Sequence, residues 1–346
     1  MVSSSPYQCL TLSLLILPPL LLTTYFLAAF PNPPEPTFLH TSLASLPATS
    51  KSWSIYPENY YPGGGYATFP YGRVRYWVMG PETGEKVVLI HGLSIPAIIW
   101  KEIAPKLASR GYRVLLYDLY GRGYSDAPQM TYDPNLYTIQ LALLMQHLRW
   151  DKAAIVGVSM GGGIAAAFTA QFPHLVNGKV VLIASAGLME TSDISRTAKF
   201  MSSPLIQTLA SSTPVRKYLQ RLTNSTRGAE SNPLTEIVRL QSAHLPGYNA
   251  ALSSSLRDGP IRGQAAAFSS DGFKGRRVLL IHGTEDVTVH PKYAPLILSM
   301  LPSDTRARSK LISVDGAGHD LTVSHSTLVA DSLVAFLEGK EMETET

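Results

Sequence analysis

Cysteine is almost absent from this chain of 346 residues, because Cys9 is the only one. A single cysteine excludes an intrachain disulfide and a zinc site built from clustered cysteines. Charge is also scarce: the net charge is only +4 and no run of five basic residues occurs, so we expect no nucleic-acid partner. The motifs H-E-x-x-H, Walker A and G-x-G-x-x-G are missing too, and the sequence therefore predicts neither a metal nor a cofactor.

Charged residues are missing from the N-terminal end, where the first is Glu35. Residues 10–30 are apolar apart from a few serines and threonines, and the run is long enough to cross a bilayer. Pro18 and Pro19 interrupt it and predict a kink. We expect residues 1–33 to hold a membrane anchor, and the protein to be membrane-associated through it. The alternatives are a bent segment entering one leaflet and a cleaved signal peptide, which would leave a secreted protein.

The remaining chain divides by composition. Residues 34–51 lie in a stretch rich in proline, serine and threonine and predict a linker. Residues 52–340 predict one globular domain, whose core is supported by the 45% hydrophobic content of the chain. Residues 341–346 are polar and predict a frayed tail.

Short apolar runs alternate with helix-compatible segments through most of the predicted domain. The expected strands are a hairpin at 66–69 and 73–79, then 87–90, 113–117, 153–158, 179–184, 277–281 and 310–314. The expected helices are 98–110, 136–148, 161–172, 292–301 and 321–337. This alternation predicts an α/β fold with a doubly wound, mostly parallel sheet covered by helices on both faces.

Residues 189–271 break the alternation. They are rich in serine, with helix-like pieces at 194–201 and 234–242 between prolines and glycines. We interpret them as an inserted helical lid over the carboxyl edge of the sheet, where ligands bind in sheets of this kind. Asn224 begins a glycosylation sequon within this insertion.

The most informative stretch is residues 157–161, Gly-Val-Ser-Met-Gly, which fits G-x-S-x-G between an expected strand and an expected helix. A sharp strand-to-helix turn strains Ser159 and pushes its Oγ outward, while side chains at Gly157 and Gly161 would collide with the turn. The Met160 N–H at the start of the helix is then available to stabilise an oxyanion.

A serine nucleophile needs a base, and the base needs an orienting acid. Asp286 and His319 each follow an expected strand, and the chain order Ser, Asp, His is the one that accompanies this motif. Glu285, the neighbour of Asp286, is the alternative acid. The other acids and histidines weighed, and placed lower by position, are Asp118, Asp315, His282, His290 and His325.

The loop after the strand at 87–90 reads His91-Gly92-Leu93. It lies where a second oxyanion donor is needed, and we expect the Leu93 N–H to pair with that of Met160. Gly92 lets the backbone approach closely. His91 is interpreted as a structural residue that holds this loop by hydrogen bonding. The glycine-containing loop at 121–126 lacks the third glycine and the following helix of a phosphate cradle, so it too is interpreted as structural.

From about residue 66 to residue 337 the chain resembles the α/β-hydrolase superfamily. The matching segments are His91-Gly92, the loop 118–126, GVSMGG at the elbow, HGTED around Asp286 and GAGH around His319. The chain is most similar to lidded esterases and monoacylglycerol-lipase-like members, which implies ester hydrolysis through an acyl-enzyme without a cofactor. Dehalogenases and epoxide hydrolases of the superfamily have aspartate at the elbow, and serine here argues against both.

The predicted function is therefore a serine hydrolase that cleaves carboxylic esters with apolar acyl groups. Ser159 is the expected nucleophile, His319 the base and Asp286 the orienting acid, with Leu93 and Met160 as oxyanion donors. The alternatives are a carbon–carbon bond hydrolase or a cofactor-free perhydrolase on the same triad, and, more remotely, a non-catalytic binding protein. Beyond a small ester substrate and a membrane, nothing in the sequence identifies a protein partner.

Overall fold

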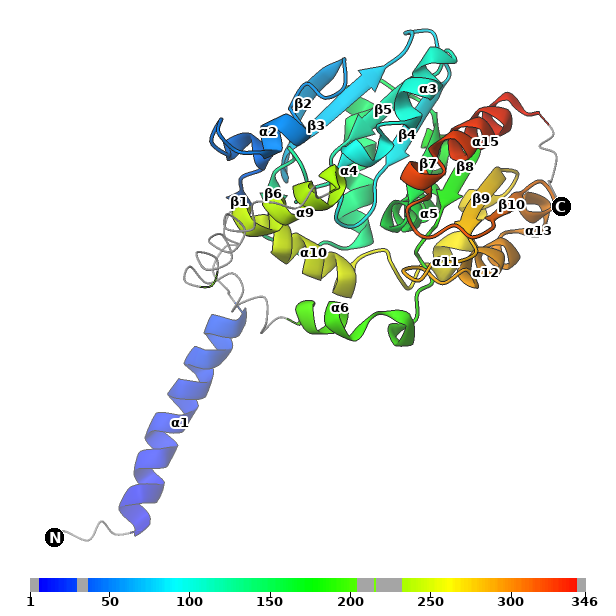
Figure 1. The fold of residues 1–346 in the computed structure, drawn as a ribbon. Helices are drawn as coiled ribbons and strands as arrows, with labels where there is room; N and C mark the ends of the chain where they lie inside the picture. Colours follow the sequence, from blue (N-terminus) through cyan, green and yellow to red (C-terminus); the bar gives the residue numbers. More distant parts are fainter. Residues whose placement is uncertain (1–5, 30–36, 204–214, 216–231, 341–346) are drawn as a thin grey trace. The chain divides into compact units, whose positions relative to one another are not determined.

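The computed structural model describes residues 6–29, 37–203, 215 and 232–340. Two units are distinguished, Met1–Thr37 and Phe38–Thr346. The first unit contains helix α1 (Pro6–Ala29), which Figure 1 shows. Pro18 and Pro19 lie inside this helix. Within the described ranges, no helix combines the length and the apolar character needed to cross a membrane. The membrane-spanning anchor expected over residues 10–30 is therefore not supported. Asn224 and the tail 341–346 lie outside the described residues.

The globular unit begins at Phe38, before the predicted boundary at residue 52. Strand β1 (Leu39–His40) pairs with β6 (Ala127–Pro128), and the side chain of Leu43 is fully buried. The Leu43 N–H also donates to the Gly123 carbonyl at 2.9 Å. The interpretation of residues 34–51 as a linker is therefore wrong from Phe38 on, because an apolar side chain among the prolines and serines enters the core.

An eight-stranded sheet forms the centre of this unit, in the order β10-β9-β8-β7-β4-β5-β3-β2 (Figure 1). Its strands are β2 (Gly64–Phe69), β3 (Gly72–Met79), β4 (Lys86–Ile90), β5 (Arg113–Tyr117), β7 (Ala153–Val158), β8 (Val176–Ile183), β9 (Arg277–Gly283) and β10 (Lys310–Val314). Strand β3 runs antiparallel to β2 and β5, and all other neighbours are parallel. The expected hairpin and mostly parallel sheet are confirmed.

Both faces of the sheet are covered by helices. Alternate side chains of β4 enter different cores, with Val87 and Leu89 in one and Val88 and Ile90 in the other, as the period of a strand requires. Helices α3 (Ile103–Ser109) and α15 (Ser326–Glu338) pack into the first core. The second core contains side chains of α4 (Pro134–His147), α5 (Met160–Gln171) and α12 (Tyr293–Met300).

Two expected helices are interrupted. The segment 98–110 forms a 3₁₀ turn at Ala97–Trp100 and then the shorter α3. Pro105 has no N–H to donate to the Lys101 carbonyl, which disfavours one continuous helix here. The segment 321–337 is divided at His325 into α14 (Leu321–Ser324) and α15.

The expected insertion is helical where it is described. It contains α6 (Arg196–Met201), α9 (Pro233–His244), α10 (Pro246–Asp258) and α11 (Ala265–Phe268), and residues 204–214 and 216–231 lie outside the described ranges. Helices α9 and α10 follow one another along one side of the globular unit, with α6 beside α10 (Figure 1). The sequence did not predict α10. Among the described residues, the remaining α-helices of the unit are the short α2 (Ser52–Ile55) and α13 (Ser303–Arg306).

Candidate active site

Ser159 lies at the sharp turn between β7 and α5, with φ 56° and ψ −122°. Such a conformation is strained for a non-glycine residue. The turn explains its glycines: a Cβ on Gly157 would lie 2.1 Å from the Gly161 carbonyl oxygen, and a Cβ on Gly161 would lie 2.3 Å from the Ile90 carbonyl oxygen. The predicted elbow geometry and the need for both glycines are confirmed.

The structure brings together the three residues predicted to act with one another. His319 Nε2 lies 2.9 Å from Ser159 Oγ, and His319 Nδ1 lies 2.7 Å from Asp286 Oδ2. A carboxylate only accepts hydrogen bonds, so Nδ1 carries the proton and Nε2 is free to accept from the serine hydroxyl. The three side chains therefore form one hydrogen-bonded chain with the base oriented toward Ser159.

Asp286 is buried and its carboxylate accepts further hydrogen bonds. Oδ1 receives the N–H groups of Thr288 at 2.8 Å and Val289 at 2.9 Å. Burial alone would raise the pKa of Asp286, but hydrogen bonds from His282, His319 and Val289 hold that pKa below its ordinary value. The acid is therefore ionised and able to orient the imidazole.

The alternative acids have other environments. The side chain of Glu285 is exposed to solvent, next to the buried Asp286 that holds His319. Asp118 is fully buried and accepts hydrogen bonds from Tyr56 Oη, Ala97 N–H and Tyr124 N–H. Asp315, the third alternative, accepts from the Thr284 hydroxyl. Of these carboxylates, only Asp286 contacts His319.

His282 is the residue of this site that the sequence reasoning missed, since it was considered only as an alternative base. The ring is 3% exposed, and Nε2 lies 3.3 Å from Asp286 Oδ2 and 2.8 Å from the Val289 carbonyl oxygen. Both neighbours are acceptors, so Nε2 carries the proton and donates to them. The signal available in the sequence was the position of His282 at the end of a buried strand, four residues before the acid.

The expected oxyanion donors lie beside Ser159. A Cβ on Gly92 would lie 3.3 Å from Ser159 Cβ and 3.7 Å from its Oγ, so the 91–93 loop approaches the serine closely. Met160 is the first residue of α5, where a helix leaves its N–H groups unpaired. Among the residues that the structure describes, neither the Leu93 N–H nor the Met160 N–H has a hydrogen-bond acceptor. Both N–H groups are thus left without a partner inside the described protein.

His91 holds this loop, as expected of a structural residue. The Leu119 N–H donates to His91 Nε2 at 2.9 Å, so the proton is on Nδ1, which donates to the Gly92 carbonyl at 2.8 Å. Burial lowers the pKa of His91 to about 3, and the charge of Arg122 acts in the same direction. The ring is therefore neutral. In a trans peptide the C=O and N–H point in opposite directions, so a fixed Gly92 carbonyl also fixes the Leu93 N–H.

The 121–126 loop is structural, in agreement with its interpretation from the sequence. Each of its N–H groups donates within the protein: to Asp126, Leu119, Gln241, Asp118, Arg122 and Arg73 in chain order. No backbone N–H of this loop remains for a phosphate. In the part of the chain that the structure describes, no group of three or more His, Cys, Asp or Glu residues is arranged to hold a metal ion.

A cavity of about 580 Å³ adjoins Ser159 and His319. Its lining is mostly aliphatic and comes from the 91–99 loop, the end of β7, the insertion, the 286–289 loop and residues 319–323. The aliphatic residues are Leu93, Ile95, Ile99, Val158, Met189, Ile194, Leu234, Leu256, Ile261, Val287, Val289 and Val323. Such a cavity suits an apolar ligand group next to the reactive serine.

This sheet order, the serine elbow and the Ser–His–Asp chain together define an α/β hydrolase. A family model described as the alpha/beta hydrolase fold matches residues 86–326. The chain belongs to this family.

Sequence identity to individual members of the family is low. The chain is 28% identical over 249 residues to an uncharacterised protein of Mycobacterium tuberculosis, covering 68% of this chain and 70% of that protein. It is 28% identical over 262 residues to the 2-hydroxymuconate semialdehyde hydrolase of a Pseudomonas species, covering 73% and 87%. Among solved structures, the bromoperoxidase of Bacillus anthracis superposes with a TM-score of 0.62 at 23% identity, covering 80% of this chain and 99% of that one. The last likeness concerns the fold alone.

Proposed function

We propose that the protein is a serine hydrolase that cleaves carboxylic esters through an acyl-enzyme. The observation that carries this proposal is the hydrogen-bonded chain from Ser159 through His319 to Asp286. Ser159 Oγ attacks the ester carbonyl while His319 Nε2 takes its proton, and Asp286 stabilises the imidazolium that forms. The Leu93 and Met160 N–H groups bind the oxyanion.

The second half of the reaction uses the same groups. The tetrahedral intermediate collapses, the carbon–oxygen bond to the alcohol breaks, and His319 gives its proton to the leaving alcohol. His319 then takes a proton from water, which attacks the acyl-enzyme. Collapse of the second intermediate returns the proton to Ser159 Oγ and releases the acid. No step requires a cofactor.

The acyl group is proposed to be apolar, as in lipid-derived esters. The aliphatic lining of the 580 Å³ cavity supports this, because burying an apolar chain there removes it from water. Met189, Ile194, Leu234, Leu256 and Ile261 of the insertion contribute to that lining. The insertion is therefore proposed to set the preference among acyl lengths.

Carbon–carbon bond hydrolysis is the second candidate, favoured by the 28% identity to 2-hydroxymuconate semialdehyde hydrolase. A panel separates the candidates: p-nitrophenyl esters of increasing acyl length against a vinylogous 1,5-diketone, with and without hydrogen peroxide for perhydrolysis. We expect ester turnover to dominate and to rise with acyl length up to the capacity of the cavity. Turnover of the diketone without ester turnover would replace the proposal by the second candidate.

Membrane association through residues 10–30 is a separate proposal, supported by the exposed apolar side chains of α1, among them Leu14, Leu17 and Phe26. Fractionation of cells expressing the full chain is expected to recover it with membranes, whereas a chain lacking residues 1–32 should be soluble and active. Recovery of the full chain, with Met1 retained, in the soluble fraction would contradict the proposal. Loss of Met1 and a new N-terminus after this segment would indicate secretion instead.

A further inference from the structure

Arg122 is buried without a counter-ion. Its side chain is 0% exposed, and among the described residues it forms no ion pair with a carboxylate. Burying a guanidinium is costly unless its N–H groups are satisfied. Here they donate to neutral oxygens on different elements, and the identity of those oxygens indicates what the residue does.

One side of the guanidinium binds the loop at residues 91–94, which carries the expected oxyanion donor Leu93. Arg122 Nε donates to the Leu93 carbonyl oxygen at 2.9 Å. The preceding carbonyl, that of Gly92, is held by His91 at 2.8 Å, and the following one, that of Ser94, accepts from the Tyr248 hydroxyl at 3.0 Å. Three consecutive carbonyls are therefore fixed, and the Leu93 N–H lies between the first two.

The other side of the guanidinium holds the insertion. Arg122 Nη2 donates to Ser255 Oγ of α10 at 2.8 Å, and Nη1 donates to the Tyr137 hydroxyl at 2.6 Å. Tyr137 and Ser255 are themselves 2.6 Å apart, which closes a buried triangle. Ser255 and Tyr137 are fully buried, so these bonds are not exchanged with water.

The backbone of the 121–126 loop, which carries Arg122, also contacts the insertion. A Cβ on Gly121 would lie 2.4 Å from Ala251 Cβ, so α10 packs directly against this glycine. The Gly123 N–H donates to Gln241 Oε1 of α9 at 2.7 Å. The position of α9 and α10 is thus fixed on the same few residues that hold Leu93.

We propose that Arg122 is a positioning residue that fixes the Leu93 oxyanion donor and transmits to it the position of α10. The inference rests on the proposed serine-hydrolase function. Arginine suits this role because its planar fork donates in two directions at once, to Leu93 and to Ser255. When α10 is bound to Arg122 through Ser255, the Leu93 N–H is aligned in the oxyanion hole. When α10 is displaced, the Leu93 N–H is misaligned.

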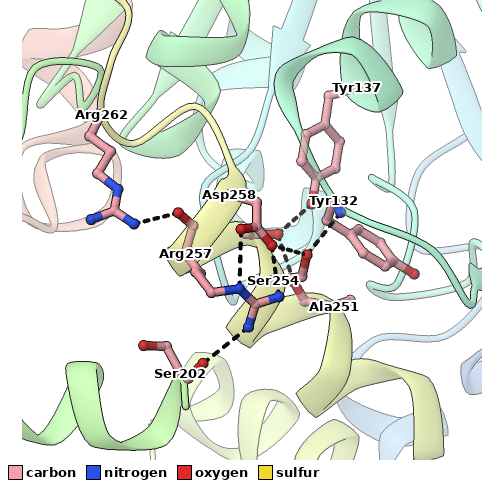
Figure 2. Close-up of polar contacts among 9 residues, drawn as sticks. Tyr132, Tyr137, Ser202, Ala251, Ser254, Arg257, Asp258 and Arg262 are labelled. Atoms are coloured by element: carbon pink, nitrogen blue, oxygen red, sulfur yellow. Dashed lines mark hydrogen bonds and ion pairs between the residues drawn. The ribbon is translucent and has the colours of Figure 1, made fainter. Parts of the chain in front are cut away.

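Neighbouring contacts of α10 provide a control. Ser254, adjacent to Ser255, accepts from the Tyr132 N–H at 2.9 Å and donates to Asp258, as Figure 2 shows. Ser254 thus links α10 to Tyr132 through a single hydrogen bond and forms no hydrogen bond with Arg122. Ser254→Ala therefore tests the loss of an α10 contact that does not involve Arg122.

The experiment measures the second-order rate at which a fluorophosphonate labels Ser159, since the adduct uses the oxyanion hole whatever the natural substrate is. Arg122→Met should lower this rate and kcat on a short ester about 10²-fold, as misplacement by about 1 Å does. Arg122→Lys should lose nearly as much, because it keeps the charge but not the fork. Ser255→Ala and Tyr248→Phe should each cost roughly tenfold, and Ser254→Ala should match the wild type.

A double-mutant cycle separates positioning from a purely structural role. If α10 acts on Leu93 through Arg122, adding Ser255→Ala to Arg122→Met should slow labelling no further. Wild-type labelling rates in folded Arg122→Met or Arg122→Lys would overturn the inference, as would additive losses in the double variant. If Arg122→Met does not fold, wild-type rates in folded Ser255→Ala and Tyr248→Phe would overturn it. Absence of labelling in the wild-type protein would instead overturn the proposed function, and the inference with it.

Discussion

His282 shares the carboxylate of Asp286 with His319: its Nε2 lies 3.3 Å from the same Oδ2 atom that accepts from His319 Nδ1 at 2.7 Å. The acid of the site is thus held between two imidazoles. Because His282 also donates to the Val289 carbonyl, it connects the acid to the loop that follows. The Asp286 carboxylate is therefore held by His282 on one side while it orients His319 on the other.

This arrangement predicts that His282 contributes to catalysis through Asp286. His282→Leu removes one charge-assisted hydrogen bond, and we expect kcat/KM to fall about tenfold, equivalent to about 1.4 kcal/mol. His282→Gln keeps an N–H donor at a similar position and should recover most of the activity. His290→Gln, an exposed histidine nearby, is the control. Equal losses in the Leu and Gln variants would mean that His282 acts through packing alone.

Asp286 and Glu285 should behave differently although they are adjacent. Asp286→Asn is expected to lower kcat on the order of 10⁴-fold, because the amide favours the wrong tautomer of His319. Glu285→Gln should change kcat little, since its side chain is exposed. Steady-state kinetics on a p-nitrophenyl ester distinguish the two. The reverse ranking would assign the acid to Glu285.

The neutral state of His91 predicts a pH dependence of stability. Its pKa is lowered from 6.5 to about 3 in the folded protein, first by burial. Between these values the unfolded chain holds a proton on this ring and the folded protein does not, so lowering the pH favours unfolding. The free energy of unfolding should therefore fall from about pH 6.5 downward, by up to about 1.4 kcal/mol per pH unit from this group.

Denaturant unfolding at several pH values checks this dependence. His91→Asn removes the titrating ring and should show a shallower loss of stability between pH 6.5 and 3, even though the variant is less stable overall. A slope equal to that of the wild type would mean that His91 does not remain neutral when folded.

The contact between α6 and α10 predicts an effect on acyl selectivity. Arg257 of α10 donates to the carbonyl of Ser202, the residue after α6, at 3.1 Å (Figure 2). Arg257→Met should lower the kcat/KM ratio of a long-chain to a short-chain ester by up to about fivefold, the range of an exposed polar contact. Acetate hydrolysis should change little. Lys274→Met, which removes the exposed pair with Asp271, is the control. A loss that is equal across acyl lengths would assign Arg257 a structural role.

The sequence predicted the strands of the eight-stranded sheet and the Ser159–His319–Asp286 chain because each depends on local signals: apolar runs, glycines that a turn requires, and polar residues that follow strands. It did not predict α10, whose Ser254 and Ser255 lie in a serine-rich stretch but are buried and bonded to Tyr132, Arg122 and Tyr137. The roles of Arg122 and His282 were likewise hidden, because their partners Leu93, Ser255 and Asp286 are identified only when distant segments meet. Tertiary contacts override local composition at these positions.

The most direct test of the account is whether Ser159 is an activated nucleophile. Intact-mass analysis after treatment with a fluorophosphonate should show one adduct, mapped to Ser159, in the wild-type protein. Ser159→Ala should show none and should lower kcat for ester hydrolysis on the order of 10⁴-fold or more, while its unfolding transition stays close to that of the wild type. His319→Ala should also remain unlabelled. Near-wild-type ester hydrolysis by Ser159→Ala, or an adduct on another residue, would contradict the account.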